Sequence, residues 1–283
     1  MSVNKKYKSS VFTILFDTPT KLLTLFNAIT GEELSLDTPV KIATLDDVIF
    51  TERRNDIAFV VEDKIVVLIE HQSSINANMP LRLLIYISRV YEKLIDNKAI
   101  YMKKLLKIPK PDFVVLYNGI ELYPEIMTLR LSDAYEKHPK IQTGAGGSLE
   151  LKVRVININE GRNRDIVDKS KELSGYVRFV GKVRRHQHVG LELKAAVTQA
   201  AKECIDEGVL ADFFKSHSSE VINMLTTEWK LEDAIAVGRE EGREEGREEE
   251  KRHLILEMKK KGFADELISE ITKLPIEKVR EIN

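Results

Sequence analysis

The sequence has a single cysteine, Cys204, among its 283 residues. An internal disulfide is therefore excluded, and a lone thiol is typical of proteins that work in a reducing compartment. No apolar run approaches the roughly 20 residues that a membrane-spanning helix needs, and the first residues, MSVNKKYKSSVFTILFD, lack the apolar core of a signal peptide. We expect a soluble, cytoplasmic protein that has no membrane as its partner.

An excess of charge of either sign is also absent. Lysine and arginine number 44 and aspartate and glutamate 45, which gives a formal net charge of −1. Bulk attraction to nucleic acid or to an anionic membrane is therefore excluded, and any basic surface must be local. Apolar residues make up 43% of the chain, which is enough for a large packed core.

Short apolar runs alternate with segments of helical periodicity. The pattern predicts a strand hairpin at 57–61 and 65–69, strands at 110–119 and 152–161, an extended segment near 40–50, and helices over 10–29 (two pieces), 78–95 and most of 165–236. Strands interleaved with helices, without an internal repeat, favour an α/β or α+β core.

Two of the expected helices have recognisable start signals. Thr18 is placed to cap a helix that begins at Pro19, and Gly31 is placed to end it. Pro80 suits the first turn of the helix over 78–95. The apolar side chains expected to share one face of that helix are Leu84, Ile87, Val90, Tyr91, Leu94 and Ile95.

The composition changes at GREEGREEGREEEKR, residues 238–252. This run has a four-residue period, almost no apolar side chains and Glu–Arg pairs at helical spacing, so we interpret it as a solvated helical linker. The segment after it, 253–283, predicts a small helical unit with a turn at Leu274 and Pro275. A helix-turn-helix that reads DNA and a small bundle that packs or dimerises fit this pattern equally well.

The hairpin at 55–72, NDIAFVVEDKIVVLIEHQ, carries acids close to a buried core. If residues 62–64 form a three-residue turn, Asp56 faces Glu70 across the strand pair, and Gln72 projects from the same side. Opposed like charges need a compensating cation or strong solvation, and a divalent metal would supply the cation. Two carboxylates and the backbone carbonyl of His71 would suit a magnesium ion.

This interpretation depends on the register of the hairpin. A two-residue turn would place Asp56 and Glu70 on opposite faces, and polar residues at strand ends are commonplace without any site. His71 lies on the other face from Glu70, where a packed or hydrogen-bonded histidine is more common than a metal ligand. From spacing alone, both interpretations stay open.

The residues in their order along the chain are similar to a known family. RNDIAFVV, LIEHQSSINANMPLRLLIYISRVYEKL, PDFVVLYNG, VININEGRN and the GREEG repeats resemble the Rpn family (recombination-promoting nuclease, or putative transposase), within the PD-(D/E)XK nuclease superfamily. The resemblance runs from about residue 7 to the charged repeats. It implies a restriction-endonuclease-like α/β core, a mixed central sheet flanked by helices, followed by a helical C-terminal region.

Carried over residue by residue, the resemblance implies a metal site. Asp56 matches the metal-binding aspartate and Glu70 the second metal ligand, while the His71 carbonyl is a third candidate ligand. Gln72 stands where many members of the superfamily have a lysine. A glutamine cannot supply positive charge, but it can orient a water or bind a metal through its amide oxygen, so more charge neutralisation falls to the ion.

Four further residues follow from the resemblance. Arg82, Tyr86 and Arg89 match the helix motif RLLxYxxR and share one helix face, where they could bind phosphate or replace the missing lysine's charge. A solvated basic face without a function is the alternative. Ser9, in YKSSVF, stands where family members often have an aspartate, so the site could be active, weakened or inactive.

The implied organisation has four parts: a nuclease core over 1–160, a helical extension over 161–237, the linker over 238–252 and the small unit over 253–283. The implied activity is that of an endonuclease that cuts double-stranded DNA with Mg²⁺, Mn²⁺ or Ca²⁺. The implied role is in recombination or in the processing of mobile-element or phage-related DNA. The expected assembly is a homo-oligomer, with a dimer favoured. One alternative is an inactive nuclease fold that binds DNA or assembles. A transposase that joins strands has only the family's name in support.

Overall fold

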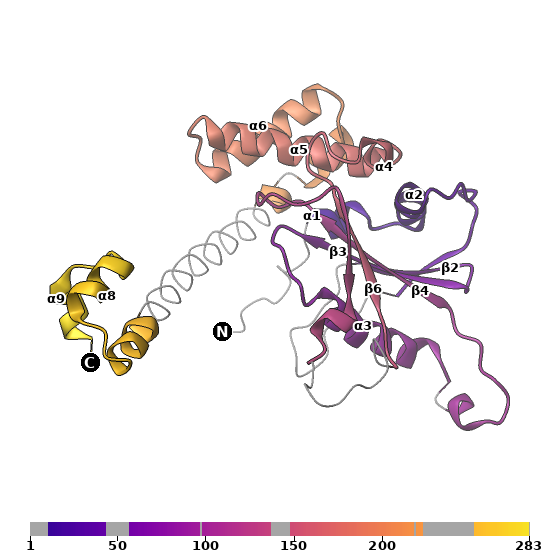
Figure 1. Ribbon diagram of the computed structural model, residues 1–283. Coiled ribbons are helices and arrows are strands. Elements are labelled where there is room, and N and C mark those ends of the chain that lie inside the picture. The colour runs from indigo at the N-terminus through magenta and orange to yellow at the C-terminus, as the bar shows by residue number, and fades with distance from the viewer. Residues whose placement is uncertain are drawn as a thin grey trace, which may run out of the picture. The chain divides into compact units, whose positions relative to one another are not determined.

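The structure, a computed structural model, describes residues 11–43, 57–96, 98–136, 148–217, 219–222 and 252–282. The chain divides into two compact units, Met1–Glu228 and Trp229–Asn283 (Figure 1). The elements of the first unit are α1 (Val11–Leu15), α2 (Pro19–Thr30), β1 (Val40–Ile42), β2 (Ile57–Val61), β3 (Ile65–Gln72), α3 (Met79–Leu94), η2 (Ala99–Tyr101), β4 (Lys110–Tyr117), β5 (Ile126–Arg130), η3 (Leu131–Ala134), β6 (Lys152–Asn157), α4 (Arg164–Val167), α5 (Lys171–His188) and α6 (Leu193–Asp206).

A six-stranded mixed sheet forms the centre of the first unit, in the order β1-β2-β3-β4-β6-β5. The three middle strands β3, β4 and β6 run parallel, and the outer pairings are antiparallel. β3 and β4 are joined through α3, the crossover that a parallel pair requires. This confirms the expected α/β core with a mixed sheet between helices.

The hairpin has the three-residue turn on which the metal-site interpretation depends. Val61 pairs with Ile65, and the ladder continues to Ile57 opposite Ile69. Glu62 and Asp63 have positive φ angles of 50° and 56°, and the Lys64 amide donates to the Val61 carbonyl over 3.0 Å. These left-handed residues tighten the turn, so the short connection keeps the register that an alternating strand pair needs.

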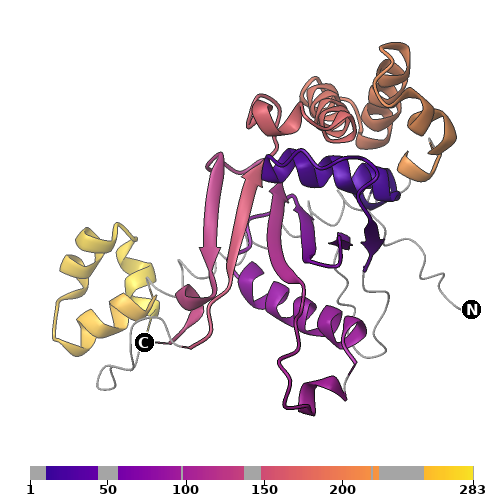
Figure 2. The ribbon, with the colours of Figure 1, turned by 90° about the vertical axis from the view of Figure 1, so that its right-hand side faces the viewer.

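Helices cover both faces of the sheet. In Figure 2, α2 lies on one side of the strands and α3 on the other. Both hairpin strands are therefore buried on both faces, which explains why their sequences read as continuous apolar runs. α2 has the expected cap, since the Thr18 side chain accepts from the Lys21 amide, and Gly31 ends it at φ 80°.

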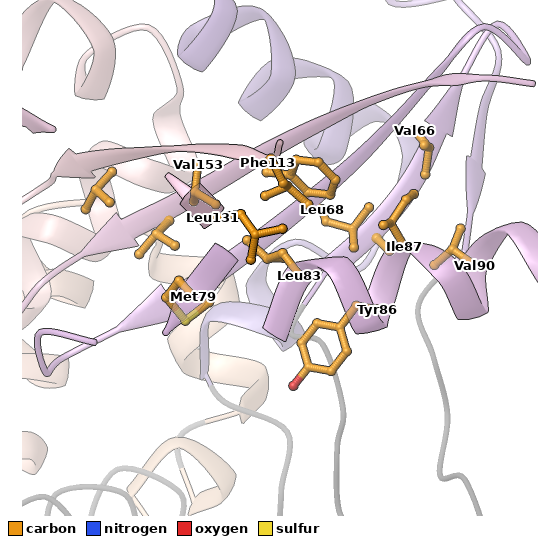
Figure 3. Packing of buried hydrophobic residues seen from close by; sticks show 14 of the residues in the cluster. Val66, Leu68, Met79, Leu83, Tyr86, Ile87, Val90, Phe113, Leu131 and Val153 are labelled. Carbon is orange, nitrogen blue, oxygen red and sulfur yellow. The ribbon is translucent and has the colours of Figure 1, made fainter. Parts of the chain in front are cut away.

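α3 packs its apolar side chains against one face of the sheet (Figure 3). Leu83, Ile87 and Val90 meet Val66 and Leu68 of β3 in one buried cluster. The expected stripe was therefore partly wrong. Leu84 and Tyr91 are only partly buried, and Leu94 is 43% exposed. The face of α3 that contacts the sheet is instead centred on Leu83, Ile87 and Val90.

The remaining predictions differ from the structure mainly at element ends. β4 and β6 stop at Tyr117 and Asn157, two and four residues before their expected ends, and only Val40–Ile42 of the segment near 40–50 falls on described residues as strand. The edge strand β5 was missed. Its residues alternate poorly and are largely exposed, so no buried apolar run marks it.

α4, α5 and α6 follow β6 and occupy the expected helical region. Ser170 caps α5, because its side chain accepts from the Leu173 amide over 3.2 Å. α5 packs beside α6, and Phe179 of α5 contacts Phe214 from the helical segment that follows. No helix in the described part of the chain is long and apolar enough to cross a membrane.

The second unit has a helix over 252–260, α8 (Asp265–Thr272) and α9 (Ile276–Glu281). Ile255, Ile268 and Val279 form its small core. Leu274 and Pro275 connect α8 to α9, as expected, and Lys273 ends α8 at a φ of 57°. Most of the charged repeats lie outside the described residues, so the linker over 238–252 stays a prediction.

Candidate metal and DNA site

Glu70 is a buried carboxylate at the end of a central strand. It lies two residues before the end of β3, on the face that α3 covers, and its side chain is 3% exposed. Full burial of a lone carboxylate is unfavourable, so such a group requires a cation or several hydrogen-bond donors. Its position therefore marks a polar site within an apolar layer.

Arg82 supplies a cation from the first turn of α3. Its Nη2 donates to Oε2 of Glu70 over 3.0 Å and lies 3.2 Å from the Tyr86 hydroxyl. The guanidinium carbon also lies 5.8 Å from the centre of the Tyr86 ring. Tyr86 points its hydroxyl away from the sheet (Figure 3), so Arg82 is held between the strand and the outer side of α3.

Gln72 lies beside Glu70 on the same face of β3. Its Nε2 contacts Sδ of Met79, at the start of α3, over 2.7 Å, and Nη1 of Arg82 contacts the same sulfur over 3.4 Å. A thioether is a weak acceptor, so this contact contributes little hydrogen-bond energy to the amide. Glu70, Gln72 and Arg82 are thus brought together around one fully buried methionine.

Two of the expected site residues lie outside the part of the chain that the structure describes. These residues are Asp56 and Ser9. The last observed pair of the hairpin is Ile57 with Ile69, and Asp56 is the residue next to Ile57 in the sequence. Among the residues that the structure does describe, no three histidine, cysteine or acidic side chains gather as a metal site. The pairing of Asp56 with Glu70 therefore stays a prediction that the three-residue turn permits.

Arg89 lies seven residues after Arg82, on the same face of α3 and about 10 Å further along the helix axis. It does not join the cluster around Glu70, because two helical turns separate the two arginines. Of the three helix residues singled out from the motif, Arg82 and Tyr86 contact each other and Arg89 stands apart. Arg89 remains a candidate for phosphate binding at a distance from Glu70.

His71 projects from the opposite face of β3. Its ring stacks on Phe12 at a centroid distance of 5.1 Å, and its Nε2 lies 3.1 Å from the Tyr176 hydroxyl. Burial, with a smaller effect from the positive charge of Arg184, lowers the pKa of His71 to about 4. The side chain is therefore neutral at neutral pH and joins α1, β3 and α5, as expected for a packed histidine.

The lowered pKa makes stability depend on pH. An unfolded histidine titrates near pH 6.5, so between pH 6.5 and 4 the unfolded chain binds a proton that the folded protein does not. Stability is therefore lost as the pH falls through this window. Relative to His71→Gln, which cannot titrate, the wild type is expected to lose about 3 kcal/mol of unfolding free energy between pH 7 and pH 4.

Urea denaturation of both proteins at several pH values measures this difference, and the other acidic groups cancel in the comparison. His188→Gln, on the exposed end of α5, is the matched control. A difference between wild type and His71→Gln that stays constant with pH would contradict the assignment of a neutral, enclosed imidazole.

Sequence reasoning missed a cavity of about 600 Å³ at the carboxyl end of β4. Arg184 of α5 lines it and donates to the Asn118 carbonyl and, over 2.6 Å, to Oδ1 of Asn159. Gly119, beside it, has no room for a side chain, because a Cβ would lie 2.1 Å from the Ser73 carbonyl. The signal in the sequence was polar: Asn118-Gly119 follows β4, and Asn159-Glu160-Gly161 follows β6.

A mixed sheet between helical layers, with a buried acid near the end of β3, defines an α/β protein with a nuclease-like core. A scan against family models matches residues 47–201, more than half of the chain, to Transposase_31, described as "Putative transposase, YhgA-like". The chain belongs to this family, which confirms the Rpn resemblance. No curated protein and no solved structure matches it.

The matched stretch includes most of the candidate site and leaves Ser9 outside. Membership indicates a nuclease-like function linked to mobile DNA elements.

Proposed function

We propose that this protein is a divalent-metal-dependent endonuclease that hydrolyses phosphodiester bonds in double-stranded DNA. The observation that carries the proposal is the buried Glu70 carboxylate, 3% exposed, at the end of a central strand and 3.0 Å from Arg82. A buried ion pair with a partly exposed arginine contributes little net stability. A role in binding a metal and a phosphate explains its place better than a role in folding.

The donors present fit a hard divalent cation. The Glu70 carboxylate, the His71 backbone carbonyl and the Gln72 amide all offer oxygen, the ligand atom that Mg²⁺, Mn²⁺ and Ca²⁺ prefer. Asp56 is the proposed second carboxylate. When bound, the ion would lower the pKa of a coordinated water and neutralise charge on the scissile phosphate.

Arg82 and Gln72 take the roles that a lysine has in related sites. Arg82, held by Glu70 and Tyr86, places a permanent positive charge at the edge of the site, where it can attract a phosphate. Gln72 donates its amide to Met79, a weak acceptor that a water could replace, and its amide oxygen could then orient that water. Arg82 thus supplies the charge that Gln72 lacks.

A nuclease fold that binds DNA without cutting it is the second candidate, and Ser9 is the observation that favours it. An acid missing from the metal site would weaken metal binding, because each carboxylate adds charge that holds the ion. This candidate shares the Arg82 and Arg89 surface with the first but needs no metal.

The test is cleavage of supercoiled plasmid by the full chain with Mg²⁺, Mn²⁺ or Ca²⁺, and after EDTA. We expect nicked and linear products that EDTA abolishes and added metal restores. Ser9→Asp is assayed beside the wild type. Cutting by Ser9→Asp alone identifies a disabled nuclease, and DNA binding without cutting by either protein contradicts the endonuclease in favour of the second candidate.

A further inference from the structure

The loop between α3 and β4 combines strong positive charge with exposed apolar side chains. We call residues 98–110, KAIYMKKLLKIPK, the lysine arm. No acidic residue occurs between Asp96 and Asp112. The arm has five lysines, all exposed: Lys98, Lys103, Lys104, Lys107 and Lys110. In a chain whose net charge is −1, the arm is a local concentration of positive charge.

The apolar residues of the arm are exposed as well. Tyr101 is 90% exposed, Leu105 74% and Met102 63%, and Ile100 and Ile108 are also exposed. Exposed apolar side chains in such a cluster mark a surface that binds something. The lysines between them would repel a second copy of the same arm, and their charge favours an anionic partner that also offers apolar surface.

The base of the arm is anchored, so its position is defined. The Tyr91 hydroxyl of α3 donates to the Pro109 carbonyl over 2.7 Å, and the Lys110 amide donates to the Lys64 carbonyl, also over 2.7 Å. At the other end, the Asp96 carbonyl accepts from the Ala99 amide over 2.9 Å. Figures 1 and 2 both show the loop extending away from the sheet.

α3 connects the arm to the candidate site. The helix begins beside Glu70, carries Arg82 in its first turn and ends at Leu94, just before the arm. Sixteen helical residues span about 24 Å, or about seven base pairs of duplex at 3.4 Å each. Arg89 lies between the two ends. A duplex bound at Glu70 therefore reaches the arm within one helical turn of DNA.

From this arrangement we propose that the lysine arm is a second contact for duplex DNA. The arm binds the duplex about seven base pairs away from the candidate cleavage site at Glu70. Its lysines contact phosphates, and Tyr101 and Met102 enter the minor groove or wedge against a base step, as apolar side chains of minor-groove proteins do. The proposal rests on the proposed function, because it assigns DNA as the partner and Glu70 as the end of the track.

An anionic membrane is the rival partner for a cationic, apolar segment. Segments that lie on membranes form amphipathic helices with one continuous apolar face. Only Ala99–Tyr101 of the arm is helical, and the apolar residues 100–102 are consecutive, so they do not share one face. Duplex DNA, which takes separate wedges and separate phosphate contacts, matches the arm better.

The test compares two triple variants of the full chain that remove the same charge from different places. The arm variant is Lys103→Gln/Lys104→Gln/Lys107→Gln. The control is Lys169→Gln/Lys194→Gln/Lys202→Gln, whose lysines are exposed near or on α5 and α6. Binding to a fluorescent 30-base-pair duplex is measured by anisotropy in EDTA at several salt concentrations, so that cleavage does not interfere.

For the arm variant, we expect affinity at 0.1 M salt to fall about 100-fold and the slope of log K against log salt to decrease by about 3, since each phosphate contact contributes about 0.9. The control is expected to stay within about twofold of wild type. A second variant, Tyr101→Ser/Met102→Ser, is expected to weaken binding without changing the slope, because it removes no charge.

Each outcome separates the arm from the proposed nuclease. If the arm variant and the control variant bind the duplex equally well, the arm is not a DNA contact. The proposed endonuclease activity is then still supported if the wild type cuts plasmid. A wild type that binds through the arm but never cuts supports the arm and sinks the nuclease. A wild type that ignores the duplex and sediments with phosphatidylglycerol vesicles overturns the arm as a DNA contact.

Discussion

Replacing Glu70 by glutamine is expected to reduce the rate of plasmid cleavage about 1000-fold or more. The glutamine keeps the shape of the buried side chain but removes the negative charge that would hold a divalent ion, and the ion supplies most of the charge neutralisation at a site without a lysine. DNA binding in EDTA should change little, because the arm and the helix arginines are unaltered.

Glu92→Gln is the matched control, because Glu92 is an exposed glutamate on α3. Its cleavage rate should stay within about twofold of wild type. Circular dichroism and thermal unfolding show whether Glu70→Gln is folded, so that a lost activity is not mistaken for a lost fold. A folded Glu70→Gln protein that cuts at the wild-type rate would remove Glu70 from the site.

Replacing Arg82 by methionine is expected to lower the free energy of unfolding by about 2–3 kcal/mol. The substitution leaves the Glu70 carboxylate, 3% exposed, without the arginine that lies 3.0 Å away. Removal of one partner from a buried pair costs about 3–5 kcal/mol, and the 38% exposure of the Arg82 side chain reduces that figure. Urea unfolding at pH 7 measures it.

The double variant Glu70→Gln/Arg82→Met should recover most of that loss, because it no longer buries an unpaired charge. Arg89→Met, the same change on the same face of α3, should cost less than about 1 kcal/mol. Equal effects of Arg82→Met and Arg89→Met would show that the buried Glu70 carboxylate does not depend on Arg82 for charge compensation.

The hairpin shows what could be predicted from the sequence and why. The two apolar runs and the three residues between them implied a register, and the observed pairing of Val61 with Ile65 confirmed it. Such a prediction is robust because a slip of one residue would reverse every side chain between two buried faces. The cap at Thr18 and the stop at Gly31 are equally local signals, and both are correct.

The features that sequence reasoning missed depend on contacts between distant segments. β5 is an exposed edge strand whose place is set by its pairing with β6. Arg184 lies 66 residues from Asn118, whose carbonyl it contacts, and no local pattern connects the two. Arg82 was singled out by its motif, but its ion pair with Glu70 could not be predicted, because it depends on how α3 docks on the sheet.

A manganese-soaked crystal of the wild-type protein tests the central claim most directly. We expect an anomalous difference peak within coordination distance of a Glu70 carboxylate oxygen and of Asp56. A well-ordered Glu70 that stays bound to Arg82, with no anomalous density beside it at saturating manganese, would contradict the metal site.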